Sequence, residues 1–161
     1  MYKEVKGDLI RMAQIGSFDV VGHGVNCFNA QEGGLAPLMV KAFRTDKFVK
    51  EHRNLEGDIN KLGTIDWKLV SLADAHFLSE DFADDEDTIY VVNCYTQYNP
   101  GADANYAALT LCMKKINHVF KGKHIGLPKI GAGIGGLDWI KVRRIIKREL
   151  KECNVTVVIL P

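Results

Sequence analysis

The sequence lacks a surplus of charge of either sign. Its 161 residues include 21 Lys and Arg and 20 Asp and Glu, so the formal net charge is +1. A protein that grips a nucleic acid backbone by overall charge needs a clear basic surplus, so we expect no nucleic acid partner. The chain also has no acidic tail.

Long apolar segments are absent as well. The first eight residues hold two lysines and two acids, where a signal peptide has an apolar core. No apolar run approaches the roughly 20 residues that cross a bilayer. We therefore expect a cytoplasmic protein with no membrane association, a monomer built as one domain over residues 1–161.

Cysteine is scarce and scattered, which excludes several kinds of site. No two of the four cysteines lie within four residues of one another, so zinc-knuckle spacing is absent. The Cys-x5-Arg loop of tyrosine phosphatases follows neither Cys27 nor Cys94. A Walker A motif and a G-x-S-x-G motif are also missing, and no His, Asp and Glu cluster has metal-ligand spacing. We expect buried free cysteines, no metal and no cofactor.

Alternating strand and helix patterns predict an α/β fold with a largely parallel sheet. Two of the runs, at 89–95 and 155–160, are apolar on both faces, as in strands covered by helices on both sides. An acidic run at 79–87 is interpreted as an exposed loop. Helices are expected at 35–50, 105–120 and 138–151, and strands at 2–6, 19–26, 65–72, 89–95, 124–130 and 155–160.

One face of the last predicted helix is strongly basic. Such a face can indicate nucleic acid binding, but the whole chain is nearly neutral. We therefore interpret it as a solvated helix surface. Its residues are Lys141, Arg143, Arg144, Lys147, Arg148 and Lys151.

Glycine is abundant, and it gathers after two predicted strands. Backbone N–H groups of a glycine loop that leads into a helix form a natural anion site. Two such loops at one sheet edge predict an elongated ligand that carries phosphates. The first cluster is Gly22, Gly24, Gly33 and Gly34, and the second is Gly131, Gly133, Gly135 and Gly136.

The second cluster has the form G-x-G-x-x-G, but its context argues against a dinucleotide fold. A dinucleotide fingerprint opens its domain and is followed by an acid at the end of the next strand. Here the motif lies near the end of the chain, and the next strand ends in Leu160 and Pro161. Polar residues accompany the first cluster instead: His23, Asn26, Asn29, Gln31 and Glu32.

Three motifs in this order resemble the macrodomain family, which binds ADP-ribose. They are residues 5–9 (VKGDL), residues 20–26 with 32–36 (VVGHGVN and EGGLA), and residues 127–139 (LPKIGAGIGGLDW). The resemblance covers nearly the whole chain. It implies a three-layer α/β/α sandwich around a mixed, mostly parallel sheet of about six strands.

The resemblance also implies a ligand-binding role for each motif. Asp8 would accept a hydrogen bond from the adenine amino group, beside the N–H of Leu9. Asn26 matches the asparagine that holds the distal ribose. The two loops that would cradle the phosphates comprise Gly33, Gly34, Leu35 and Ala36 on one side and Gly131, Ala132, Gly133, Ile134 and Gly135 on the other.

Within the family, the chain is similar to a small single-domain branch marked by Gly-x-x-Trp, here Gly136 to Trp139. One activity of that branch removes ADP-ribose from glutamate with a lysine and an aspartate, whose positions fall near Tyr95 and Gly135. The other is the phosphatase of ADP-ribose 1″-phosphate. Its pattern of His, Asn-Cys and Gly-Gly-hydrophobic-Ala is similar to residues 23–36.

We therefore predict a metal-independent phosphatase that acts on ADP-ribose 1″-phosphate. His23 is the first candidate for general acid or base, because an unperturbed histidine has a pKa of about 6.5. Asn26 would orient the ribose and a water. Glu32, where the family usually has glycine, is the second candidate base.

Two alternatives remain open at this point. The chain could be a hydrolase that removes ADP-ribose from protein or nucleic acid, although the lysine of that route is missing. It could also be a non-catalytic module that binds ADP-ribose.

Overall fold

The computed structural model describes residues 1–49, 57–73, 76–78 and 87–161. Except for its last residue, the acidic run expected as an exposed loop lies outside the described residues.

A seven-stranded sheet runs through the middle of the molecule in the order β1-β7-β6-β2-β5-β3-β4. The first five strands in this order pair in parallel, and β3 is antiparallel to both of its neighbours. The mixed, mostly parallel sheet is therefore confirmed, and β4 is a two-residue edge strand beyond those expected. The strands are β1 (Tyr2–Lys6), β2 (Val20–Asn26), β3 (Ile65–Ser71), β4 (Phe77–Leu78), β5 (Thr88–Gln97), β6 (His124–Leu127) and β7 (Asn154–Ile159).

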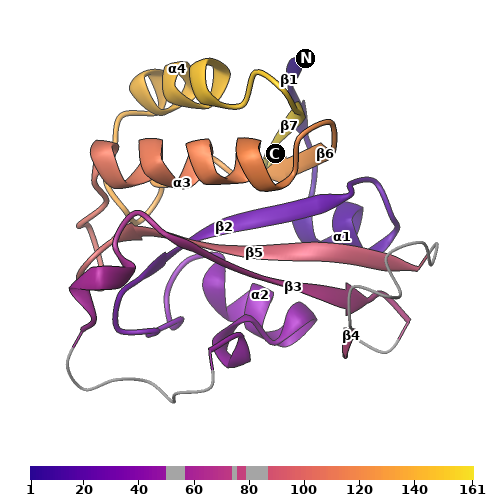
Figure 1. The fold of residues 1–161 in the computed structure, drawn as a ribbon, viewed down its shortest axis with the longest axis horizontal. Helices are drawn as coiled ribbons and strands as arrows, with labels where there is room; N and C mark the ends of the chain where they lie inside the picture. Colours follow the sequence, from indigo (N-terminus) through magenta and orange to yellow (C-terminus); the bar gives the residue numbers. More distant parts are fainter. Residues whose placement is uncertain (50–56, 74–75, 79–86) are drawn as a thin grey trace.

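Helices cover both faces of this sheet, as Figure 1 shows. On one face lie α3 (Tyr106–Val119) and α4 (Trp139–Glu149), and on the other lie α1 (Leu9–Gln14) and α2 (Ala36–Phe43). Each face has its own apolar core, and adjacent β2 residues divide between them: Val20 packs with the α3–α4 core and Val21 with the α1–α2 core. The three-layer α/β/α sandwich is confirmed.

Three element boundaries differ from the sequence expectations. The expected helix at 35–50 ends as α2 at Phe43, because Arg44 adopts a left-handed conformation (φ 58°) before the short 3-10 turn η1 (Thr45–Lys47). Strand β6 stops at Leu127, since Pro128 follows and has no N–H to donate to a neighbouring strand. Helix α1 was not expected, and it begins after Asp8, whose side chain accepts a hydrogen bond from the Arg11 N–H.

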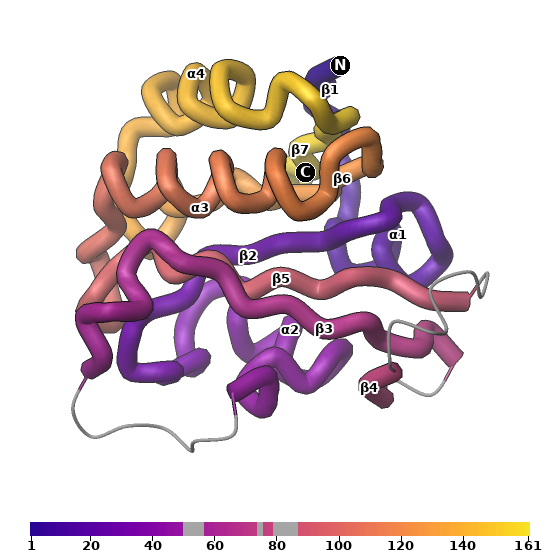
Figure 2. Tube along the Cα trace, in the orientation of Figure 1, coloured from indigo at the N-terminus to yellow at the C-terminus, as the bar shows by residue number. Residues whose placement is uncertain are grey.

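The five parallel strands end at the same edge of the sheet, and Figure 2 shows β2 and β5 running to the left toward it. The loops after β2, β5 and β6 lie at this edge, together with Asp8, which follows β1. In open α/β sheets ligands bind beyond the carboxyl ends of the strands. This edge is therefore the expected place for a ligand site.

Candidate functional site

Asn26, the last residue of β2, shapes the loop that follows it. Its side-chain oxygen accepts hydrogen bonds from the backbone N–H groups of Phe28 (3.0 Å) and Ala30 (3.2 Å). Its amide nitrogen donates to the Ala30 carbonyl oxygen at 2.8 Å. The side chain thus closes its own loop, and the amide keeps one further hydrogen for a ligand.

A buried polar network joins this loop to the segment after α2. The Thr45 hydroxyl donates to Gln31 Oε1 at 2.6 Å, and Gln31 Nε2 donates to the Thr45 carbonyl oxygen at 3.1 Å. Gln31 Nε2 also donates to Asn29 Oδ1 at 3.0 Å, and Asn29 Nδ2 donates to the Asp46 carbonyl oxygen at 2.9 Å. Asn29 itself is left-handed (φ 52°), a conformation that asparagine tolerates well. These bonds fix the entry to the first glycine loop.

His23 is the innermost member of the same network. Its ring is only 1% exposed, and its Nε2 lies 2.7 Å from Asn93 Oδ1. The Asn93 amide nitrogen donates to the Thr45 carbonyl oxygen at 2.9 Å, so Asn93 Oδ1 accepts and His23 Nε2 carries the proton. The His23 Nδ1 atom is buried and has no hydrogen-bond partner in the described part of the chain.

Burial changes what His23 can do. It lowers the pKa of the imidazole to about 4, and the hydrogen bond with Asn93 opposes this only in part. The ring is therefore neutral at pH 7, and the pKa of about 6.5 on which its expected catalytic role rested does not hold. As a buried neutral group, His23 is placed to position Asn93. Neither Asn93 nor Thr45 was expected from sequence, because no motif links them to the loop.

The first glycine loop leads directly into α2. Gly34 has φ +62°, and the Ala36 N–H donates to the Gly33 carbonyl oxygen at 3.3 Å. Among the residues that the structure describes, no acceptor is found for the N–H groups of Gly33, Gly34 and Leu35. Glu32, directly before them, is exposed. The loop thus offers three N–H donors beside one carboxylate at the start of a helix.

The second glycine loop is shaped by its own backbone. The Leu137 N–H donates to the Gly131 carbonyl oxygen at 2.9 Å, and the Ala104 N–H donates to that of Gly135 at 3.1 Å. A Cβ at Gly135 would lie 2.7 Å from the Gly131 carbonyl oxygen, so only glycine fits there. The N–H of Ala132 is engaged with the Lys129 carbonyl oxygen at 3.0 Å.

Three N–H groups of this loop stay available. In the described ranges, the backbone N–H groups of Gly133, Ile134 and Gly135 have no acceptor. The two loops also meet, because a Cβ on Gly34 would stand 3.0 Å from Ile134 Cδ1. The structure thus brings the two sets of predicted phosphate-binding residues into contact. Ile134, which is 55% exposed, is the side chain between them.

Asp8 and Leu9 lie farther along the same edge. Asp8 is exposed and caps α1, with Oδ1 accepting from the Arg11 N–H at 3.2 Å. The Leu9 side chain belongs to the α1–α2 core. Strand β1 stands three positions from β2, a separation of about 14 Å at about 4.8 Å per strand. Only an elongated ligand reaches both Asp8 and the first loop.

A polar cluster that the sequence did not indicate lies near Cys27, the residue that follows β2. The Tyr95 hydroxyl donates to Asp66 Oδ2 at 2.6 Å, and the Lys61 ammonium pairs with the same oxygen at 3.0 Å. Burial, followed by the hydrogen bond to Asp66, raises the pKa of Tyr95 well above its usual value. Burial likewise raises the pKa of the neighbouring Cys27 thiol to about 11. Both groups stay protonated at pH 7, which makes neither an activated nucleophile.

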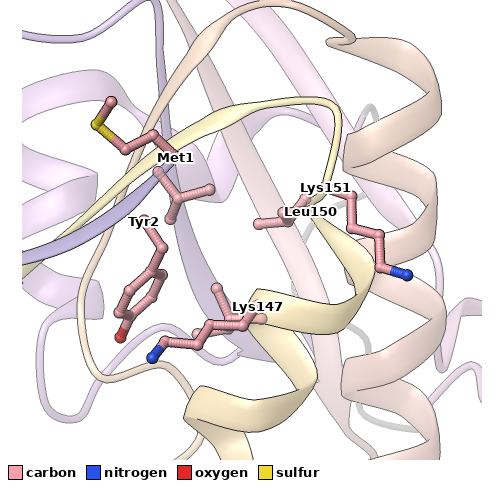
Figure 3. Close-up of a pocket in the computed structure, with 7 residues that line it drawn as sticks. Met1, Tyr2, Lys147, Leu150 and Lys151 are labelled. Atoms are coloured by element: carbon pink, nitrogen blue, oxygen red, sulfur yellow. The ribbon is translucent and has the colours of Figure 1, made fainter.

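A hollow in the described surface lies at the opposite edge of the sheet. It has a volume of about 240 Å³ and is lined by Met1, Tyr2, Ile146, Lys147, Leu150, Lys151 and Val155 (Figure 3). None of these residues belongs to a glycine loop. The described residues contain no group of three His, Cys, Asp or Glu side chains that could hold a metal. They also contain no helix with the length and apolarity needed to cross a membrane.

Comparison with known proteins gives one sequence relative and many structural ones. No protein-family profile matches the chain. The uncharacterised 17.5 kDa protein in the tk-vs intergenic region of Enterobacteria phage T4 is 30% identical over 164 residues, covering 97% of this chain and 94% of the phage protein.

The structural relatives share the fold at lower identity. The macrodomain of Thermus aquaticus DarG is 20% identical with a TM-score of 0.69, covering 100% of this chain and 98% of that one. A Bacteroides thetaiotaomicron protein of unknown function is 22% identical with a TM-score of 0.67, covering 99% of this chain and 98% of that one. Thermosipho africanus DarTG in complex with ADP-ribose is 18% identical with a TM-score of 0.67, covering 98% of this chain and 41% of that one.

Proposed function

We propose that this chain, which belongs to the same family as the 17.5 kDa phage T4 protein and has the macrodomain fold, binds ADP-ribose or a close derivative at its glycine-loop edge. The observation that carries the proposal is the pair of touching loops with unsatisfied N–H groups. A diphosphate between them would accept hydrogen bonds from Gly33 and Gly34 on one side and from Gly133 and Gly135 on the other. Backbone donors bind an anion without a basic patch.

The remaining parts of the nucleotide find matching groups along the edge. Asp8 keeps a carboxylate oxygen for the adenine amino group, since only Oδ1 is used in capping α1. The Leu9 N–H lies next to it and has no acceptor in the described chain. The distal ribose would lie by the free hydrogen of the Asn26 amide. The adenine at Asp8 after β1 and the distal ribose at Asn26 on β2 would thus be as far apart as these two strands.

We further propose that the site hydrolyses ADP-ribose 1″-phosphate. Water attacks phosphorus, the bond from phosphorus to O1″ breaks, and the ribose oxygen takes a proton as inorganic phosphate leaves. The loop N–H groups would stabilise the charge that builds on the phosphate oxygens. Glu32 is the candidate base for the water, because it is exposed beside Gly33, whereas His23 is buried and neutral.

The test combines calorimetric binding of ADP-ribose with phosphate release from ADP-ribose 1″-phosphate. We expect binding by the wild type and by Glu32→Gln, and turnover that falls at least about tenfold in Glu32→Gln. Glu152→Gln, an exposed carboxylate on the far side of α3 and α4, is the matched control and should keep wild-type turnover. Equal turnover in all three proteins contradicts the role of Glu32.

The same assay separates the alternatives. Binding of ADP-ribose without phosphate release indicates a non-catalytic module. Release of ADP-ribose from modified protein or nucleic acid, with no phosphatase activity, indicates the hydrolase. Absence of any ADP-ribose binding overturns the proposal as a whole.

A further inference from the structure

Charge is segregated along this nearly neutral chain. Residues 105–153 contain eleven Lys and Arg but only three Asp and Glu, a net charge of +8. The rest of the chain contains ten Lys and Arg and seventeen Asp and Glu, a net charge of −7. Because 105–153 form the α3–α4 layer with β6, one layer of the sandwich is strongly basic (Figure 1).

The basic charge is concentrated on the outer side of α4. Val142, Ile145 and Ile146 turn inward to the core, and the cations lie on the remaining faces of the helix. Ion pairs neutralise few of these cations: the described residues hold only Arg143–Glu4 at 3.6 Å and Arg148–Glu149 at 3.2 Å on this helix. We call the exposed set the α4 basic stripe: Lys141, Arg144, Lys147, Arg148 and Lys151.

Aromatic rings stand directly beside these cations. The Lys147 ammonium lies 4.9 Å from the centre of the Tyr2 ring, and Lys141 lies 5.6 Å from that of Tyr106. Surfaces that bind single-stranded nucleic acid combine cations for the phosphates with rings for the bases. The α4 basic stripe has both.

The 240 Å³ hollow opens at the carboxyl end of this stripe. Figure 3 shows the Tyr2 ring on one side, Leu150 and Lys151 on the other, and Lys147 at the margin. The volume is below the roughly 300–1,000 Å³ of pockets for drug-sized ligands, so it fits one flat ring system instead of a whole nucleotide. An acidic side chain of a protein partner would gain nothing from its apolar floor of Ile146, Leu150 and Val155.

We propose that the α4 basic stripe and this hollow bind single-stranded nucleic acid. Backbone phosphates lie along the stripe, and one unpaired base enters the hollow against Tyr2. The stripe runs along α4 away from the second glycine loop, and the hollow lies at the opposite sheet edge, so this surface uses none of the groups of the proposed nucleotide site. It also revises the sequence interpretation of a merely solvated helix, which rested on whole-chain charge.

The test is fluorescence anisotropy with a labelled single strand and a duplex of the same length, over a range of salt concentrations. The variant Arg144→Glu/Lys147→Glu/Lys151→Glu is expected to bind the single strand at least about tenfold more weakly. Its slope of log K against log salt should be shallower by about 2, since each phosphate contact contributes about 0.7. Lys41→Glu/Lys47→Glu/Lys68→Glu makes the same charge change on exposed lysines outside this layer. Its single-strand affinity and its salt slope should both stay much closer to those of the wild type.

The hollow is tested separately. Tyr2→Ala should weaken single-strand binding about tenfold with an unchanged salt slope, and Tyr2→Phe should retain it, because the ring supplies the stacking. A circular dichroism melt checks that each variant is folded. The proposal is overturned if the wild type binds neither oligonucleotide, if it prefers the duplex, if both triple variants weaken equally, or if it binds only anionic vesicles.

Discussion

The first glycine loop is held by side chains, whereas the second is held by its own backbone. Asn26, Gln31 and Thr45 form the buried hydrogen bonds that seat the first loop. In the second loop, the carbonyl oxygens of Gly131 and Gly135 accept from backbone N–H groups, and no polar side chain takes part among the described residues. Within the described ranges, each loop nevertheless has three N–H groups without an acceptor at one sheet edge.

This difference determines how each loop tolerates change. A loop seated by buried polar side chains couples its geometry to protein stability, because an unpaired buried group costs about 1–3 kcal/mol. A loop seated by close backbone approach depends on the absence of a Cβ instead. Substitutions in the two loops should therefore affect binding and stability in different proportions.

The largest effect is expected from Gly135→Ala. The added Cβ would lie 2.7 Å from the Gly131 carbonyl oxygen and 2.8 Å from Ala104 Cβ, so the backbone of the loop must move. Overpacking costs about 1–3 kcal/mol, and a loss of about 3 kcal/mol in binding is a factor of about a hundred in affinity. Calorimetric titration with ADP-ribose measures this loss of affinity.

Gly133→Ala is the matched control for this substitution. A Cβ at Gly133 meets nothing within 4 Å in the same loop. The free energy of unfolding of Gly133→Ala should stay within about 0.5 kcal/mol of wild type, because no protein atom has to shift, whereas Gly135→Ala should lose about 1–3 kcal/mol. Equal losses of stability in Gly135→Ala and Gly133→Ala would show that the close approach of the loop backbone at Gly135 does not cause the effect.

The next effect tests the first loop through Asn93→Leu. The substitution leaves the buried His23 Nε2 proton without its acceptor and removes one of the two donors to the Thr45 carbonyl oxygen, which keeps Gln31 Nε2. We expect the free energy of unfolding to fall by about 2 kcal/mol, because one buried group loses its hydrogen bond and another is weakened, and ADP-ribose affinity to fall with it. Chemical denaturation and calorimetry measure the two quantities on the same protein.

Asn99→Leu supplies the comparison for Asn93→Leu. Asn99 is exposed just beyond β5, and among the described residues its side chain hydrogen-bonds only with the nearby Asp103. Its stability should change by less than about 0.5 kcal/mol. If Asn93→Leu weakens neither stability nor binding, the first loop does not rely on the network, and the contrast between the loops disappears.

Local signals in the sequence predicted the layers and the two loops correctly. Apolar periodicity located α3 and α4 to within a few residues, and the expected strand at 2–6 is β1. Glycine placement located both loops, because a tight turn needs glycine wherever it occurs. Helix α1 was missed since its six residues are too few to show helical periodicity.

Features that depend on distant residues could not be predicted in this way. The burial that lowers the pKa of His23, and the pairing of His23 with Asn93 across β2 and β5, exist only in the folded sheet and follow from no spacing in the sequence. The Tyr95–Asp66 pair joins two strands whose register only the folded sheet defines. The basic face of α4 was visible in the sequence, but whole-chain charge led to its interpretation as a solvated surface, because the acids elsewhere in the chain cancel it in the sum.

The smallest effect is a pH dependence that belongs to the first loop alone. The pKa of His23 is about 4 in the folded protein and about 6.5 when unfolded, so between these values only the unfolded chain binds the proton. The contribution of His23 to stability is therefore complete above pH 6.5, decreases as the pH falls towards 4, and is constant below that. Between pH 7 and pH 5 it amounts to about 2 kcal/mol.

Denaturant unfolding at pH 7 and pH 5 of the wild type and of His23→Gln isolates this contribution. The free energy of unfolding should differ between pH 7 and pH 5 by about 2 kcal/mol less in His23→Gln than in the wild type, because glutamine does not titrate. His118→Gln, which removes an exposed imidazole from α3, is the matched control. An unchanged pH dependence in His23→Gln contradicts the burial of a neutral His23. A reduced one shows that protonation of His23 destabilises the fold that holds the first loop, whereas among the described residues no titratable side chain takes part in the hydrogen bonds of the second loop.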